Sequence, residues 1–136
     1  MIKYILTFYL LLLFNSCSEY WLFGEKRLGN NFVLVNENQY KTYILYCYSR
    51  GDFGCKTGIE VIPPHIMEIA YDDEWILARS RKTNIDSFWI IDKSFNLILE
   101  YDNYVSDSIK AHIYGPFDSL SFNQEIIDRD IKLKLP

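Results

Sequence analysis

HIMEIAYDDEWILARSRKTNIDSFWIIDKSFNLILEY, residues 65–101, is the stretch that decides the fold. It holds four short apolar runs separated by polar turns, at 65–71, 75–80, 88–92 and 96–101. Short strands with polar turns at this spacing predict an antiparallel meander, because parallel crossovers need longer connections. Residues 88–91 (FWII) are apolar on both faces, so this strand is expected to lie in the middle of the sheet.

Two further strands are expected before the meander. Residues 32–35 follow a turn at 28–31, and a longer run covers 41–49. In the longer run Tyr43 and Leu45 alternate with Ile44 and Tyr46, which predicts an interior strand covered on both sides. Pro63-Pro64 must then end any strand or lie in an edge strand, because neither residue can donate a ladder hydrogen bond.

The C-terminal part is expected to contain a helix. Residues 102–110 are polar and predict a loop, and 111–114 a short strand. Ser121 to Gln124 has the spacing of a capping box, and Phe122, Ile126 and Ile127 share a helical face that would pack on the sheet. Residues 131–135 fit a terminal strand or a frayed helix end. The expected fold class is α+β: mainly an antiparallel β-sheet meander of roughly six to eight strands with a short C-terminal α-helix packed on it.

The first seventeen residues have the pattern of an export signal. Lys3 precedes an apolar run over 4–14, which is shorter than the roughly 20 residues of a spanning helix and suits a signal peptide. Residues 13–17 (LFNSC) resemble a bacterial lipobox, which implies cleavage before Cys17 and acyl chains on that residue. A retained N-terminal anchor helix and an ordinary cleaved signal are the alternatives.

The expected organisation is a cleaved lipoprotein signal peptide at 1–16, a lipidated tether at 17–27 and one β-rich globular domain at 28–136. Cleavage would remove one lysine and no acid, which changes the formal net charge from −4 to −5. With no basic stripe, nucleic acid is not an expected partner. Aromatic residues at 20–23 would rest on the bilayer surface or pack on the domain. By the lipoprotein resemblance, Ser18 after the cysteine favours the outer membrane.

Four segments of the mature chain resemble a family of small uncharacterised bacterial lipoproteins, catalogued as a domain of unknown function. These segments are YDDEWILARS at 71–80, FWIIDK at 88–93, IYGPF at 113–117 and LGNNF at 28–32. The resemblance covers most of the mature domain. It implies the same architecture and brings no assigned activity.

Cys47 and Cys55 bracket a seven-residue loop. In an oxidising compartment such a pair is expected to close a disulfide. Free thiols are the main alternative. A metal site is the weaker one, because two thiols without a nearby His or further Cys do not complete a tetrahedral set. No metal and no cofactor is expected.

Two short acidic or charged motifs have simple structural explanations. Arg50-Gly51-Asp52 matches an adhesion tripeptide, but turn chemistry alone accounts for it. Asp72-Asp73-Glu74 lacks the spacing of a calcium loop and is interpreted as a solvated turn.

No catalytic signature occurs in the chain, and a binding function is favoured over an enzyme. The leading hypothesis is a lipid-anchored cell-envelope protein that binds another protein or a surface component. An immunity or inhibitor lipoprotein acting against a toxin or hydrolase is a sharper version of it. The rival is a small envelope hydrolase using His65 or His112 with Asp72 or Asp92.

Overall fold

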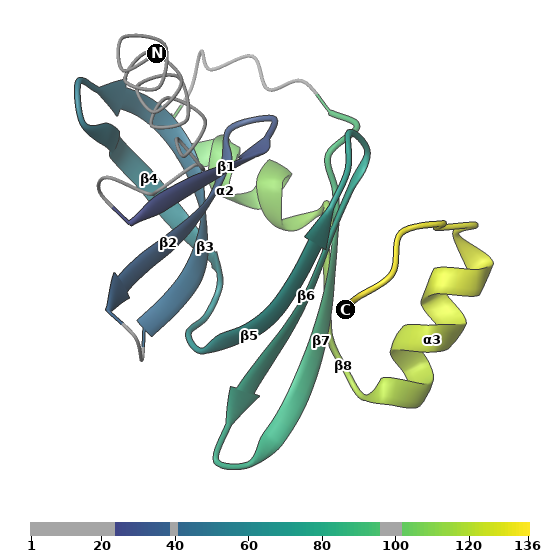
Figure 1. The fold of residues 1–136 in the computed structure, drawn as a ribbon. Coiled ribbons are helices and arrows are strands. Elements are labelled where there is room, and N and C mark those ends of the chain that lie inside the picture. Colours follow the sequence, from purple (N-terminus) through teal and green to yellow (C-terminus); the bar gives the residue numbers. More distant parts are fainter. Residues whose placement is uncertain (1–23, 39–40, 96–101) are drawn as a thin grey trace, which may run out of the picture.

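A computed structural model describes residues 24–38, 41–95 and 102–136. Two antiparallel four-stranded sheets form the domain (Figure 1). Sheet A contains β1 (Glu25–Gly29), β2 (Phe32–Asn38), β3 (Lys41–Gly51) and β4 (Gly54–Ile62). Sheet B contains β5 (Ile66–Tyr71), β6 (Trp75–Lys82), β7 (Ile85–Asp92) and β8 (Ile113–Phe117). The helices are α2 (Asp102–Lys110) and α3 (Ser119–Asp128).

The α+β class and the antiparallel meander are therefore confirmed, while the expected single sheet is replaced by two. β4 ends at Ile62, directly before Pro63-Pro64, as the sequence predicted. The two prolines stop the ladder there, and the next strand starts a new sheet. The signal peptide at 1–16, Cys17 and the strand expected at 96–101 lie outside the described residues. β1 begins at Glu25, three residues before the expected start of the domain.

Two tight hairpins are closed by two-residue turns whose backbone is left-handed. Asn30 and Asn31 have φ values of 45° and 64°, and Thr83 and Asn84 have values of 50° and 63°. Two successive residues with positive φ form the two-residue turn whose twist matches the flanking strands. Asparagine tolerates this region better than most residues, which suits Asn30, Asn31 and Asn84, whereas the β-branched Thr83 is an exception.

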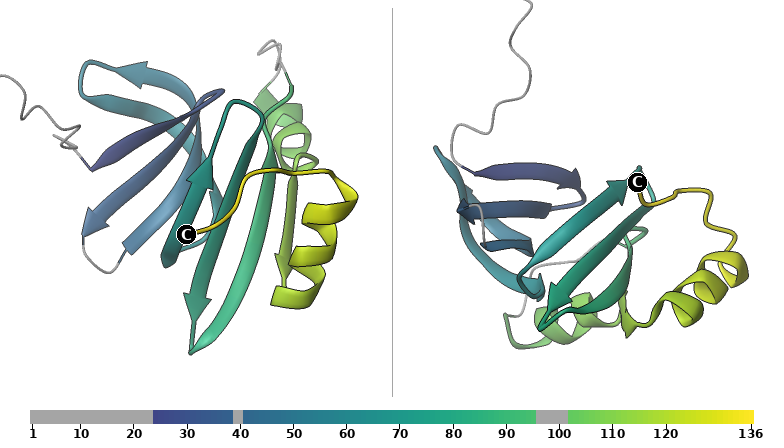
Figure 2. Two further views of the ribbon diagram at one scale, coloured as in Figure 1. Left: turned by 45° about the vertical axis from the view of Figure 1, so that its right-hand side comes forward. Right: turned by 60° about the horizontal axis from the view of Figure 1, so that its bottom comes forward.

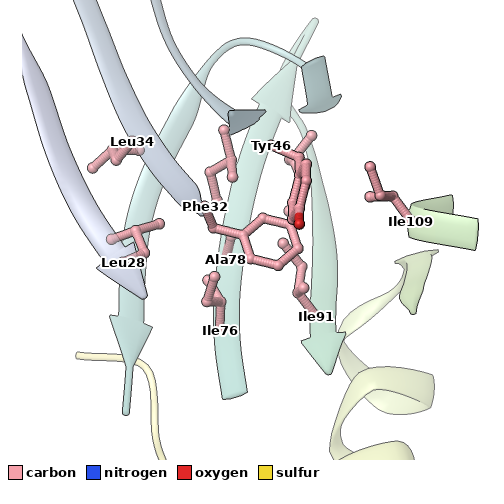
Figure 3. Packing of buried hydrophobic residues seen from close by; sticks show 10 residues of the cluster. Leu28, Phe32, Leu34, Tyr46, Ile76, Ala78, Ile91 and Ile109 are labelled. Carbon is pink, nitrogen blue, oxygen red and sulfur yellow. The ribbon is translucent and has the colours of Figure 1, made fainter. Parts of the chain in front are cut away.

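The two sheets face each other across one core. Alternation along each strand turns one set of apolar side chains inward. Figure 3 shows Phe32 and Tyr46 of sheet A opposite Ile76 and Ala78 of sheet B, with Ile109 of α2 closing one side. The rings of Phe32 and Tyr46 pack edge to face with their centroids 5.1 Å apart, which is a favourable aromatic geometry.

Strands β3 and β7 are both interior in their sheets, as predicted. β7 is also covered on both faces, because Ile91 points into the core between the sheets and Ile90 packs under α3. β3 is different. Its inner residue Ile44 is fully buried, but Tyr43 and Leu45 on the opposite face are only half-buried. Cys47 on that same face is buried, so the face of β3 that points away from the core is covered in part, less completely than predicted.

Three expectations for the C-terminal part are corrected. Residues 102–110 form helix α2 instead of a loop, and the fully buried Ile109 fixes this helix to the core. Helix α3 begins after Asp118, whose Oδ1 accepts a 2.7 Å bond from Ser121 N, so the cap lies three residues before the expected capping box. Residues 131–135 form neither strand nor helix and pack along the outer face of sheet B.

Candidate binding groove

A cavity of about 570 Å³ lies between the outer face of sheet B, helix α3 and the C-terminal segment. Figure 2 shows α3 on the side of sheet B that faces away from sheet A. We call this cavity the α3 groove. Its apolar lining includes Leu77, Phe88, Phe122, Ile126, Leu133 and Leu135. A cavity of this size with a mainly apolar lining is typical of binding sites.

Strand and helix periodicity together place this lining. Leu77 lies between Ile76 and Ala78 on β6, so it points outward while its neighbours enter the core. Phe122 and Ile126 are four residues apart and share one face of α3. The ring of Phe88 stacks on that of Phe122 with centroids 4.9 Å apart. The outward side chains of sheet B therefore form the floor of the groove, and the apolar face of α3 forms one wall.

Two arginines and two carboxylates on β5, β6 and β7 lie beside the apolar floor of the groove. Arg79 Nε donates to Glu68 Oε2 at 2.9 Å, and Arg79 Nη1 donates to Asp86 Oδ2 at 3.1 Å. Arg81 Nε donates to Asp86 Oδ1 at 2.6 Å. Because the strand register sets Arg79 opposite Phe88 and Arg81 opposite Asp86, these charges share the outer face with the apolar floor.

Hydrogen bonding keeps this network ionised. The bond from Arg81 is the main cause that lowers the pKa of Asp86, and the bond from Arg79 lowers the pKa of Glu68. The same bonds raise the pKa values of Arg79 and Arg81. Two positive and two negative groups compensate each other, so this end of the groove is polar and close to neutral.

Helix α3 also carries large apolar side chains on its solvent side. Leu120 is 82% exposed and Ile127 is 71% exposed, and Ile127 also lines the groove. The two residues are seven apart and so lie on one face of the helix. The prediction that Ile127 packs on the sheet was wrong, whereas Phe122 and Ile126 do so. Exposed apolar area that adjoins an apolar cavity is typical of an interaction surface.

The predicted disulfide is present. Cys47 and Cys55 are bonded with a Cα–Cα distance of 5.8 Å, which joins β3 to β4. The bridge closes the hairpin that carries Arg50-Gly51-Asp52. Arg50 Nη1 lies 3.9 Å from Glu25 Oε2, so part of the tripeptide contacts the start of β1. The lipidation site predicted at Cys17 is outside the described residues.

The groups proposed for a hydrolase have other contacts. The ring of His112 stacks on Phe95 with centroids 4.2 Å apart. Asp72 Oδ1 accepts the backbone N–H groups of Glu74 and Trp75, and Asp92 Oδ1 accepts that of Ser94 at 2.8 Å. Both carboxylates thus organise their own turns. His65 directly precedes β5, and its backbone carbonyl accepts a 3.0 Å bond from Arg81 N.

The acidic turn at 72–74 has no metal-binding arrangement. Throughout the parts of the chain that are described, no three His, Cys, Asp or Glu side chains are grouped so that they could hold a metal ion.

None of the described helices is long and apolar enough to cross a membrane.

Lys93 is a buried charged residue that sequence reasoning missed. Only 6% of its surface is exposed. Its ammonium group donates to the carbonyl oxygens of Leu28 at 2.6 Å and of Asp72, which links β1 of sheet A to the β5–β6 turn of sheet B. It also lies over the ring of Tyr71. A lysine directly after an apolar strand is a weak signal for such a link, because most lysines there are exposed.

Comparison with known proteins adds no family. No protein-family model, no curated protein and no solved structure matches this chain. The resemblance to small bacterial lipoproteins therefore stays a prediction.

Proposed function

We propose that the chain is a lipid-anchored envelope protein whose domain binds an apolar segment of another protein in the α3 groove. The groove carries the proposal: apolar lining continues from Leu77 and Phe122 inside the cavity to the exposed Ile127 at its edge. Contact surfaces between proteins characteristically have an apolar centre with a polar rim. The network around Arg79 supplies the polar rim here.

Two features support the envelope part of the proposal. The apolar run at 4–14 and Cys17 have the order expected of an acylated export signal. The Cys47–Cys55 disulfide agrees with an oxidising compartment. Acyl chains on Cys17 would hold the chain at a membrane, since two or more chains anchor a protein stably.

The placement of the groove suits an anchored protein. β1 starts in sheet A, whereas α3 lies beyond sheet B (Figure 1). A tether that enters at β1 would leave the α3 groove on the side opposite to its point of entry. The groove is then accessible to a partner that approaches from the aqueous compartment.

Position-specific photocrosslinking in intact cells tests the binding role. A photoreactive amino acid replaces Ile127, and a matched variant carries it in place of Ile85, which is 66% exposed in sheet B. We expect a discrete adduct from position 127 and none from position 85. A third variant carries the photoreactive amino acid in place of Leu120, and its adduct should disappear with Ile127→Asp and persist with Ile85→Asp. Equal adducts from positions 127 and 85, or none from 127, would overturn the proposed site.

The anchor is tested separately by labelling cells with a radioactive fatty acid. The full-length chain should incorporate label, and Cys17→Ala should not. Label retained by Cys17→Ala would contradict the lipoprotein assignment.

A further inference from the structure

The hairpin that joins β3 to β4 presents an apolar side chain to solvent. We call residues 50–56 the hairpin tip. Phe53 at its end is 75% exposed, and the Cys47–Cys55 disulfide closes the loop behind it. A single exposed apolar side chain is common on protein surfaces, but here the disulfide holds the loop that carries Phe53 at a fixed place on the domain.

This tip lies beside the first described residues of the domain. The Glu25 carboxylate accepts the Cys55 backbone N–H at 2.8 and 3.0 Å. It also pairs with Arg50 at 3.9 Å. The fit is close, because a Cβ atom on Gly54 would lie only 2.6 Å from Glu25 Oε2. Gly24 is fixed as well, since its carbonyl accepts Asn36 N at 2.6 Å.

Chain length limits how far the tip can lie from an anchored Cys17. Cys17 and Gly24 are seven positions apart, a separation that an extended chain spans in at most about 25 Å. The inference below rests on the proposed lipidation of Cys17. Given that anchor, the bilayer surface is within this distance of the end of the domain that carries the hairpin tip.

We propose that the hairpin tip is a second membrane contact, in which the ring of Phe53 enters the boundary between headgroups and acyl chains. Aromatic rings favour this boundary. One ring is a weak ligand for a membrane, but the anchor turns its insertion into an intramolecular step with a high effective concentration. Together the acyl chains and Phe53 give the domain a fixed orientation that directs the α3 groove away from the bilayer.

The charges of the tip indicate what kind of membrane it fits. Arg50 is paired with Glu25, and the remaining Lys56 and Asp52 have opposite signs. Attraction to anionic headgroups requires an excess of basic residues, which the tip lacks. The contact therefore depends on burial of the ring and is expected to be equally strong on neutral and anionic bilayers.

Quenching of a fluorescent side chain by labelled lipid measures the contact. The acylated full-length protein is reconstituted into phosphatidylcholine vesicles that contain phospholipid with a nitroxide near the top of its acyl chain. Dansylalanine replaces Phe53, or Ile85 as the exposed control on sheet B. We expect the nitroxide to quench position 53 severalfold more than position 85, with the same ratio when phosphatidylglycerol is added.

Each alternative result contradicts the inference in a recognisable way. Equal quenching at positions 53 and 85 in vesicles that carry the protein would overturn the membrane contact and leave the anchor intact. A residue 53 shielded from aqueous iodide but not quenched by lipid would indicate a protein contact instead. Mass spectrometry of Cys17 and flotation of the vesicles are measured first. An unmodified Cys17 with no flotation would overturn the anchor, and the inference with it.

Discussion

Lys93 lies in an environment that is unusual for a lysine. Its Nζ is removed from water and donates to the backbone carbonyls of Leu28 and Asp72, one from each sheet. Asn30 strengthens the same junction, because its Nδ2 donates to the carbonyl of Lys93 at 2.7 Å. The close fit extends to Gly29, where an added Cβ would lie 2.9 Å from Lys93 Nζ. One side chain therefore links the two sheets.

Lys93→Met should destabilise the domain by about 2–4 kcal/mol, because it leaves two carbonyls at the junction without their donor. Lys82→Met, at the exposed end of β6, is the matched control and should change stability by less than about 0.5 kcal/mol. Urea unfolding of the two variants and the wild type measures the difference. Equal stability of the two variants would show that the junction contributes little.

The stability difference between the wild type and Lys93→Met should depend on pH. Burial lowers the pKa of Lys93 from its usual 10.5, an effect that Asp72 and Asp73 partly oppose. Between the pKa of Lys93 in the folded chain and 10.5, the unfolded chain binds more protons than the folded chain. The contribution of Lys93 to the unfolding free energy therefore rises with pH in this range, and it is lost as pH falls through the folded pKa. The stability of the wild type relative to Lys93→Met should therefore increase with pH in this range. A decrease would contradict the direction of the shift.

At the scale of elements, the β3–β4 hairpin combines a disulfide with a long antiparallel ladder. The bridge lies close to the tip, where Arg50 pairs with Cys55 in the register. In the chain-entropy model, closing a loop of this length removes unfolded conformations and stabilises the native state. The disulfide thus holds β3 and β4 together near the hairpin tip, where the ladder hydrogen bonds alone would open most easily.

Replacing both cysteines, Cys47→Ala with Cys55→Ala, should cost about 2.5 kcal/mol of unfolding free energy. Reduction of the wild type should produce a similar loss, and the same reductant should leave the double variant unchanged. Denaturant unfolding with and without reductant measures both. A double variant as stable as the oxidised wild type would exclude a stabilising role for the bridge.

At the scale of the molecule, the two sheets depend on one core. Ile44 of β3 and Ile76 of β6 belong to the same buried cluster, although they come from different sheets. Neither sheet buries its inner face without the other, so the sheets should unfold together. Helix α2 adds Ile109 to this cluster and closes one side of it (Figure 3).

A cavity made in sheet A should therefore weaken sheet B. Ile44→Ala is expected to cost about 2–5 kcal/mol, and Ile85→Ala, at an exposed position, less than about 0.5 kcal/mol. Hydrogen exchange of the β6 amides reports on sheet B and should lose the same free energy as global unfolding. Unchanged protection of β6 in Ile44→Ala would show that the sheets unfold independently.

The sequence alone determined the elements in which local pattern and local chemistry agree. The short apolar runs at 75–80 and 88–92 predict strands β6 and β7, Pro63-Pro64 ends β4, and the spacing of Cys47 and Cys55 predicts the bridge. Each of these depends on neighbours within a few residues or on the period of the strand. The acyl anchor proposed at Cys17 also comes from sequence alone.

Only the tertiary structure decided which surfaces meet. The division into two sheets, the helix at 102–110 and the burial of Lys93 depend on contacts between residues far apart in the chain. Lys93 and Leu28, for example, are 65 positions apart. The α3 groove has the same origin, because Leu77, Phe122 and Leu133 lie on separate elements. Local pattern tells which face of an element is apolar, but long-range packing decides whether that face is buried or exposed.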